Sequence, residues 1–464
     1  MKNIKRLFAV TLLLAILLSS VSCRMFIRDA EAALEAVEEE MDALKSYEAT
    51  VEGSFVYYVS DKKVESTITG KNIEVGANTD QFYLYQRLDT KTKCKALSID
   101  QSLSTVEAYY QGNYFISNKE DDGHAQKLYS PATVDQVLEH LKRKGGVDDF
   151  TLLTSGTEKN YQKNDDRTKT LTIKGYDQEA LKKLLGLDDA TLEALNADRL
   201  DLEMTMKIDR SFRLSQLTMN LLLINEDPEK TSEDKQAKFT MTYTFTKYDE
   251  AEMVTEGLNV EDYKQVDNVF QPERLKKTVE DYLAAAEGRF TWKSEQKVMV
   301  MGQTSNNRET DEVTFGIRDG GYFYEVDAST ASTSLKLTYA NGKQTVINAG
   351  KETEKDQTEA QAKSFINNLI KGALSDSKNV TNVVKRENDS YAIYYNELPT
   401  SLYDAVYASM GGRCKTAKQT VTVVYSETGS LVSIKSVIET TGSIISGNSI
   451  FQMTVNMEYE VTIH

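Results

Sequence analysis

The chain repeats one layout twice along its length, and this internal duplication restricts the possible folds more than any other feature. Both halves open with a helix that carries an apolar stripe, at about 29–44 in the first half and from Pro272 in the second. Further along, each half has a hairpin-like tetrapeptide that ends in glycine, at Gly112 and at Gly342. A repeated layout of this kind predicts two tandem domains with the same fold.

Helix-capping signals follow at matching places in the two halves. A Thr-x-x-Gln capping box, in which the threonine bonds forward and the glutamine reaches back, begins at Thr133 and again at Thr358. The later helices are expected to end at Gly186 and Gly411, because glycine adopts the left-handed conformation that closes a helix. These signals therefore predict, in each half, helices between two groups of strands.

The closing strand of each half alternates between apolar and polar side chains. The segment from Phe239 to Phe245 alternates apolar residues with threonines, and the segment from Phe451 to Val461 follows the same pattern. Phe239 and Phe451 are 212 residues apart, whereas the first helices of the two halves are 239 residues apart. Loop insertions in one copy would explain this decrease in spacing. Alternation with period two predicts antiparallel strands with one buried and one solvated face.

The predicted fold class is α+β, because each apolar strand face needs a cover and the helices are available to provide it. We expect two tandem curved antiparallel β-sheets, or half-barrels, each with helices packed in the concave face. The predicted segments are a cleaved signal peptide at 1–22, a lipidated tether at 23–28, a first domain at 29–248, a linker at 249–271 and a second domain at 272–464.

This order of elements resembles the superfamily of the periplasmic lipoprotein carrier LolA and the glycolipid-binding bacterial lipoproteins related to it. The resemblance rests on the N-terminal helix before a run of strands, the hairpins at Gly112 and Gly342, the helices in mid-domain and the alternating closing strands. It implies a half-barrel whose inner face can hold an acyl chain. The chain departs from the carrier because it is duplicated and carries an anchoring signal, so the resemblance transfers no functional residue.

The N-terminus has the form of a bacterial lipoprotein signal. Basic residues precede an apolar stretch from Leu7 to Leu18, which is shorter than the roughly 20 residues that a spanning helix needs. Ser20 to Cys23 resembles the lipobox, in which the cysteine is lipidated and becomes the mature N-terminus. We expect an extracytoplasmic protein anchored by lipid on Cys23 to the outer face of the bacterial cell membrane. The alternative is an ordinary secreted protein whose signal happens to end near a cysteine.

The mature chain is strongly acidic. Removing residues 1–22 also removes Lys2, Lys5 and Arg6, which leaves 52 basic against 71 acidic residues and a formal net charge of −19. This charge excludes nucleic acid as an expected partner, and it opposes a broad electrostatic attraction to anionic lipid. The membrane contact should therefore rest on the lipid anchor.

Candidate ligand-binding residues lie on the apolar faces of the predicted strands, where flexible methionine side chains suit a variable apolar ligand. The same alternation also suits a closed core, and the sequence does not separate the two. The candidate lining residues are Met204, Met206, Met219, Phe239, Met241, Phe245, Phe451, Met453 and Met457.

Signals for catalysis, metals and cofactors are weak, so we expect a non-enzymatic protein without a cofactor. Ser60 and Ser375 begin S-x-x-K segments, but no K-T-G or S-D-N segment accompanies them. The three histidines form no metal-binding cluster, and an enzyme with dispersed residues remains a third hypothesis. Cys94 and Cys414 allow one long-range disulfide at most.

The leading interpretation is therefore a membrane-anchored lipoprotein that binds lipid or another apolar ligand in its half-barrels. The alternative is a structural or interaction lipoprotein with closed cores that acts on an envelope protein or cell-wall partner.

Overall fold

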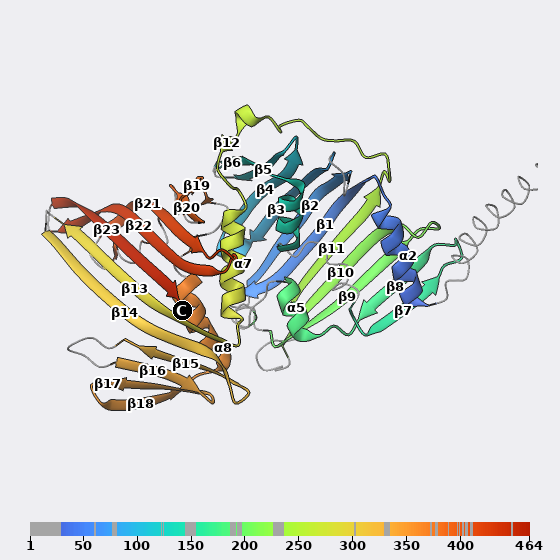
Figure 1. Ribbon diagram of the computed structural model, residues 1–464. Helices are drawn as coiled ribbons and strands as arrows, with labels where there is room; N and C mark the ends of the chain where they lie inside the picture. The colour runs from blue at the N-terminus through green and yellow to red at the C-terminus, as the bar shows by residue number, and fades with distance from the viewer. Residues whose placement is uncertain are drawn as a thin grey trace, which may run out of the picture. The chain divides into compact units, whose positions relative to one another are not determined.

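The computed structural model shows a chain that is mostly β, with two large antiparallel sheets and few helices (Figure 1). It divides into two compact units. Unit 1 comprises Met1–Ser102, Val147–Leu187 and Leu195–Val254, and unit 2 comprises Leu103–Gly146, Asp188–Ala194 and Thr255–His464. The structure describes residues 29–464 apart from 60–61, 77–80, 122, 124, 144–154, 186–191, 193–196, 226–235, 301–302, 329–334, 372–373, 376–378, 388, 397, 399, 401–402, 404–406, 409–411 and 447–448.

Unit 1 contains eight antiparallel strands of the first sheet, in the order β3-β2-β1-β11-β10-β9-β8-β7. Its strands are β1 (Ser46–Val59), β2 (Lys62–Val75), β3 (Tyr83–Cys94), β7 (Glu158–Lys163), β8 (Lys169–Lys174), β9 (Arg199–Ile208), β10 (Leu214–Ile224) and β11 (Ala237–Thr246). Its helices are α2 (Ala30–Asp42), α5 (Gln178–Leu185) and the short η1 (Lys95–Leu97). Because most strands are 10 to 14 residues long, each presents several side chains to either face.

Unit 2 contains an eleven-stranded antiparallel sheet with the order β18-β17-β16-β15-β14-β13-β23-β22-β21-β20-β19, and a smaller group with the order β12-β6-β5-β4. The large sheet consists of β13 (Glu287–Val300), β14 (Gln303–Arg318), β15 (Gly321–Asp327), β16 (Leu335–Ala340), β17 (Lys343–Asn348), β18 (Lys351–Asp356), β19 (Asn382–Lys385), β20 (Ser390–Tyr395), β21 (Gly412–Tyr425), β22 (Leu431–Ser446) and β23 (Ser449–Ile463). The smaller group consists of β4 (Ile99–Tyr110), which enters unit 2 at Leu103, with β5 (Asn113–Glu120), β6 (Ala125–Pro131) and β12 (Lys264–Gln265). The helices are α3 (Val134–Arg143), α7 (Gln271–Leu283), α8 (Glu359–Lys371) and η3 (Val260–Asp262).

The strand order of the first copy is repeated in the second. The order β3-β2-β1-β11-β10-β9-β8-β7 of the first copy is repeated by β15-β14-β13-β23-β22-β21-β20-β19 in the second. The order β6-β5-β4 is repeated in the same way by β18-β17-β16. The layout that repeats in the sequence is therefore also a repeated topology.

The pairing register corrects one of the matches predicted from the sequence. β1 and β13 are both 14 residues long, and aligning them places Ser294 at the position of Gly53. Gly53 lies opposite Met241, and Ser294 lies opposite Tyr459. By the same register Phe239 corresponds to Met457, which lies six residues beyond the predicted Phe451. Because strand side chains alternate with period two, a shift of six leaves every side chain on its face, so the alternation could not reveal the shift.

The predicted hairpin turns and capping boxes of the two copies are confirmed. β4 and β5 turn through Gln111 and Gly112, and β16 and β17 turn through Asn341 and Gly342, all four with positive φ as a two-residue hairpin turn requires. Thr133 Oγ1 accepts from the backbone N–H of the residue three positions later, and Gln136 Oε1 accepts from the backbone N–H of Thr133. The box at 358–361 makes the same two bonds. Gly186 and Gly411, the predicted helix ends, lie outside the described residues.

A closed core forms where α2 packs on one face of the unit 1 sheet. Asp29 caps α2 by accepting from the backbone N–H of Ala32, and the stripe predicted from the sequence places Leu34 and Val37 against the sheet. The strand residues of this core are Leu171, Ile173, Met204, Met206, Ile208, Leu214 and Leu217. We call the sheet face that carries them the inner face of unit 1.

The segment 255–271, most of the predicted linker, is packed within unit 2. Leu258, Val266 and Phe270 are buried, and the backbone N–H of Val266 donates to the carbonyl of Tyr129. Its short strand β12 pairs in parallel with β6, an exception among otherwise antiparallel pairs. The lack of periodicity in this part of the sequence therefore reflects an irregular backbone path.

The predicted domain boundaries stay predictions.

Candidate functional site

The inner face of unit 1 carries an apolar row that crosses six strands, and this row is the centre of the candidate site. Each member lies opposite the next in the register. In order from β2 to β8, the row consists of Ile68, Gly53, Met241, Met219, Met204 and Ile173. Every member is apolar, so the row forms a continuous hydrophobic track across the sheet.

One end of the row is covered and the other is half-exposed. Met204 and Ile173 are fully buried in the core beneath α2. Met219 is partly buried against that core, and Met241 and Ile68 are half-buried. Burial therefore decreases along the row with distance from the core beneath α2.

Two aromatic residues of β1 and one of β11 extend the half-exposed part. Phe55 and Tyr57 stack with ring centroids 4.9 Å apart, and Phe239 meets Phe55 edge-on at 6.2 Å. Gly53 has no side chain, and a Cβ placed on it would lie 2.9 Å from Met241 Sδ. We call this surface the apolar stripe, and it consists of Phe55, Tyr57, Ile68, Met219, Phe239 and Met241.

The corresponding row of unit 2 is largely polar. Its inner face is the one that carries Phe290 and Phe315, which pack on Tyr282 of α7. By register, from β14 to β20, the row consists of Glu309, Ser294, Tyr459, Ser436, Val421 and Ile393. The methionines of the first copy are thus replaced by Tyr459, Ser436 and Val421.

The polar side chains of this second face bond to one another. Gln419 and Ser436 are buried, and Gln419 Nε2 donates to Ser436 Oγ at 2.8 Å. Ser375 Oγ donates to Gln419 Oε1, so the serine of one predicted S-x-x-K segment has a structural partner. Tyr407 covers Gly442 and its hydroxyl pairs with Thr440 Oγ1 at 3.0 Å. A bonded, filled face of this kind suits an apolar ligand poorly.

Asp311 lies on the same inner face, opposite Trp292 in the register. It is 7% exposed, and its Oδ1 atom has no hydrogen-bond partner among the described residues. Burial, with smaller contributions from the charges of Glu309 and Asp327, raises the pKa of Asp311 to about 6. The corresponding position of unit 1 is Gly70, which lies opposite Val51.

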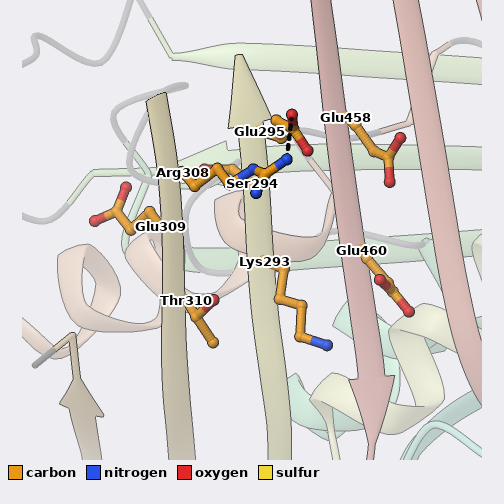
Figure 2. Close-up of a pocket in the computed structure, with 8 residues that line it drawn as sticks. All are labelled: Lys293, Ser294, Glu295, Arg308, Glu309, Thr310, Glu458 and Glu460. Atoms are coloured by element: carbon orange, nitrogen blue, oxygen red, sulfur yellow. Dashed lines mark hydrogen bonds and ion pairs between the residues drawn. The ribbon is translucent and has the colours of Figure 1, made fainter. Parts of the chain in front are cut away.

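A hollow of about 200 Å³ lies on β13, β14 and β23 (Figure 2). Glu295 accepts from Arg308 at 3.1 Å, and its ion pair with Lys297 measures 3.0 Å. These two cations, Lys297 first, lower the pKa of Glu295 to about 2. The lining residues are Lys293, Ser294, Glu295, Arg308, Glu309, Thr310, Glu458 and Glu460. Ion pairs at an exposed surface are well solvated, so the hollow is charged and does not match an apolar ligand.

The predicted lining residues fall into two groups. Met204, Met206 and Met453 are fully buried, and Met204 and Met206 belong to the closed core beneath α2. The half-buried group contains Met219, Phe239, Met241, Phe245, Phe451 and Met457. The sequence reasoning missed Phe55, Tyr57 and Ile68 of the apolar stripe. Phe55 and Tyr57 lie two positions apart, which places both on one face of a strand and could have indicated the stripe. The high β-propensity of tyrosine explained this pattern equally well without a ligand.

The cysteines take no part in the candidate site. Cys94 and Cys414 are both buried thiols, so the described residues contain no disulfide between them. Cys414 Sγ donates to the carbonyl of Thr416. Cys23, the predicted lipidation site, and Ser60 lie outside the described residues. No helix in the described part of the chain is long and apolar enough to cross a bilayer.

Comparisons with known proteins give distant similarity alone. No family model and no curated protein matches the chain. Among solved structures, a DUF1329 family protein from Desulfovibrio piger has a TM-score of 0.20 and 9% identity, over 50% of this chain and 98% of its own. The ywiB protein from Bacillus subtilis has a TM-score of 0.12 and 8% identity, over 39% and 96%. A putative AttH from Nitrosomonas europaea has a TM-score of 0.13 and 7% identity, over 90% and 93%. TM-scores this low assign neither a fold nor a function.

Proposed function

We propose that the protein is a membrane-tethered bacterial lipoprotein that binds an acyl chain or another apolar ligand on the inner face of unit 1. The observation that carries this proposal is the half-exposed apolar stripe, which continues the buried core beneath α2. Apolar area removed from water contributes about 25 cal/mol per Å². A ligand that covered the stripe would therefore gain free energy without any polar contact.

The shape of the stripe suits a flexible, elongated ligand. Methionine side chains adjust to variable apolar surfaces, and Met219 and Met241 lie side by side in the register. The Met241 side chain lies over Gly53, where a Cβ would be only 2.9 Å from its Sδ atom. The tandem LolA-like half-barrel is the finer fold that we propose, supported by the repeated strand order and by the helix on the inner face of unit 1.

The proposed tether is a lipid on Cys23, supported by the lipobox-like segment that precedes it. Two acyl chains suffice for stable attachment, whereas one gives marginal binding. Cys23→Ala should move the protein from the membrane fraction to the soluble fraction while its circular dichroism stays unchanged. Retention in the membrane after removal of the signal peptide would contradict the tether.

Ligand binding can be tested with a fluorescent fatty acid on residues 24–464, which include every described element. Met241→Gln keeps the side-chain length but places an amide in the stripe, and we expect about a tenfold weaker affinity, equivalent to about 1.4 kcal/mol. Thr67→Gln is the matched control, because Thr67 is exposed and its neighbour Ile68 points to the opposite face. Equal affinities for the two variants would place the ligand elsewhere.

The second candidate function is a structural or interaction lipoprotein that acts on an envelope protein or cell-wall partner. The polar, bonded inner face of unit 2 favours it for that unit. Native mass spectrometry separates the two functions: co-purified lipid that Met241→Gln releases supports the first. Absence of lipid, together with no displaceable fatty acid, would leave the second.

A further inference from the structure

Two aromatic side chains and two carboxylates lie together on the inner face of unit 2. Trp292 of β13 and Tyr459 of β23 are half-buried, with ring centroids 6.2 Å apart and an interplanar angle of 35°. Asp311 of β14 lies directly opposite Trp292, a pairing that brings two Cβ atoms within about 5.5 Å of each other. Glu309 precedes Asp311 by two positions, so both point to the same face. We call this group the acidic aromatic patch, and it consists of Trp292, Glu309, Asp311 and Tyr459.

Asp311 is the buried anionic group of the patch. It is 7% exposed, and its Oδ1 atom has no hydrogen-bond partner among the described residues. Burial raises the pKa of Asp311 to about 6, with smaller contributions from the charges of Glu309 and Asp327, which are both negative. Its carboxyl group is therefore mostly ionised above neutral pH. Because a buried charge is normally paired, a positively charged ligand beside Asp311 would gain an attraction that the neighbouring carboxylates do not satisfy.

The aromatic rings of the patch suit an organic cation. The face of a tryptophan or tyrosine ring attracts a cation within about 6 Å of its centroid, and tryptophan does so most strongly. Because the two centroids are 6.2 Å apart, a cation above the space between the rings can lie within this range of both. A metal ion needs several oxygen ligands, which the rings do not provide, whereas a methylated ammonium group needs none. Glu309 is exposed and both rings are half-buried, so solvent reaches the patch.

The first copy shows that the fold does not require these side chains. The residues at the corresponding places of unit 1, in the same order, are Val51, Ile68, Gly70 and Met241. All four are uncharged and none is aromatic. The same pairing therefore forms without an unpaired buried carboxylate. A costly group that the architecture does not need is typical of a functional site.

We propose that the acidic aromatic patch binds an organic cation that carries a methylated ammonium group. The ammonium group lies over Trp292 and Tyr459, and the carboxylate of Asp311 balances its charge. Glu309, at the exposed rim, attracts the cation from solvent. The same ammonium chemistry occurs in free choline and in the head group of phosphatidylcholine. The site lies within unit 2 and does not depend on the apolar stripe of unit 1.

A choline titration of the full-length chain in a non-ionic detergent tests the site. Trp292 is the one tryptophan of the chain, so its fluorescence reports the patch directly. At about pH 7.5, where Asp311 is ionised, choline should change this fluorescence in a saturable way. The neutral analogue of choline, in which a tert-butyl group replaces the trimethylammonium group, should cause no saturable change. Glycerophosphocholine separates the two sources: weaker binding than choline supports a free cation, and tighter binding supports a lipid head group at the same patch.

Three variants locate the binding. Asp311→Asn keeps the size of the side chain but removes its charge, and it should weaken choline binding about tenfold or more. Tyr459→Met copies the first repeat, where Met241 occupies this place, and it should weaken binding about threefold. Glu460→Gln is the matched control, because it removes a charge from the opposite face of β23, and it should bind choline as the wild type does.

Three results would overturn the site. They are a wild type without a saturable response to choline, an equal response to the neutral analogue, and an Asp311→Asn variant that binds choline as tightly as the wild type. If Tyr459→Met fails to fold, Asp311→Asn still decides, because it removes an unpaired buried charge and is expected to fold.

Discussion

The inner faces of units 1 and 2 have the same strand order and register but opposite chemistry. In unit 1 the row across the sheet carries Met241, Met219 and Met204, and in unit 2 the same places carry Tyr459, Ser436 and Val421. The next row repeats the contrast, since Phe55 corresponds to Gln296 by register. With the same topology and pairing, a few side chains decide whether the face is apolar and half-buried or polar and hydrogen-bonded.

The contrast also explains how each face avoids an unsatisfied polar group. Unit 1 has no polar member in its row, so the half-exposed end meets either water or an apolar ligand without loss of a hydrogen bond. Unit 2 buries Gln419 and Ser436 but bonds them to each other. A duplicated fold can therefore carry an apolar face in one copy and a hydrogen-bonded polar face in the other.

The largest effect is expected from truncating the covered part of the methionine row. Met204→Ala should lower the free energy of unfolding by about 2–5 kcal/mol, because it leaves a cavity beneath α2. Met219→Ala, at the half-buried neighbour, should lower the free energy of unfolding by about half as much, since water can enter the space that the side chain leaves. Calorimetric unfolding of the two variants measures the difference. Equal losses would show that the stripe is as closed as the core.

Gln419→Leu copies the first repeat into the second, because Leu202 occupies the corresponding place. It should lower the free energy of unfolding by about 1–3 kcal/mol, since the buried hydroxyl of Ser436 loses its donor and Ser375 Oγ loses its acceptor. Adding Ser436→Ala removes the Ser436 hydroxyl and should recover the part of the loss that comes from its missing donor. The fluorescence of Trp292, the one tryptophan of the chain, reports unfolding of this sheet in urea. A double variant as unstable as the single one would contradict the hydrogen-bond explanation.

Asp311→Asn should stabilise unit 2 at about pH 7.5 by about 1–2 kcal/mol. The raised pKa means that the folded state holds a proton that the unfolded chain releases between 3.8 and about 6. Stability from this group is therefore present below the lower value and is lost as pH rises through the upper one. The variant and the wild type should unfold alike at about pH 3.5, again by Trp292 fluorescence. A stability difference that does not depend on pH would exclude the titration of Asp311.

The smallest effect is expected at Gly53, where the two rows differ by glycine and serine. Gly53→Ala should lower the free energy of unfolding by about 1 kcal/mol. The new Cβ would lie 2.9 Å from Met241 Sδ, which can move away, and 3.0 Å from the carbonyl of Thr240. The displaced methionine should weaken fatty-acid binding more than it weakens folding. Binding as tight as in the wild type would show that the ligand does not depend on the position of the Met241 side chain.

Local signals in the sequence were sufficient for many elements. The capping boxes, the glycine hairpins and the helix stripe at 29–44 depend on neighbours within a few residues, so the sequence alone predicts them. The alternation of the long strands likewise predicts which side chains share a face. The sequence also predicted the duplication, because each copy repeats these local signals in the same order.

Only the tertiary structure decided the register of the closing strand and the openness of the inner faces. A shift of six residues preserves every face, so alternation could not choose between Phe451 and Met457 as the partner of Phe239. Openness depends on which helix covers which part of a sheet, and Met204 and Met241 have the same local pattern but different cover. The packing of His140 beside Glu107 and Phe270 is likewise formed only in the folded unit, because these residues are distant in the sequence.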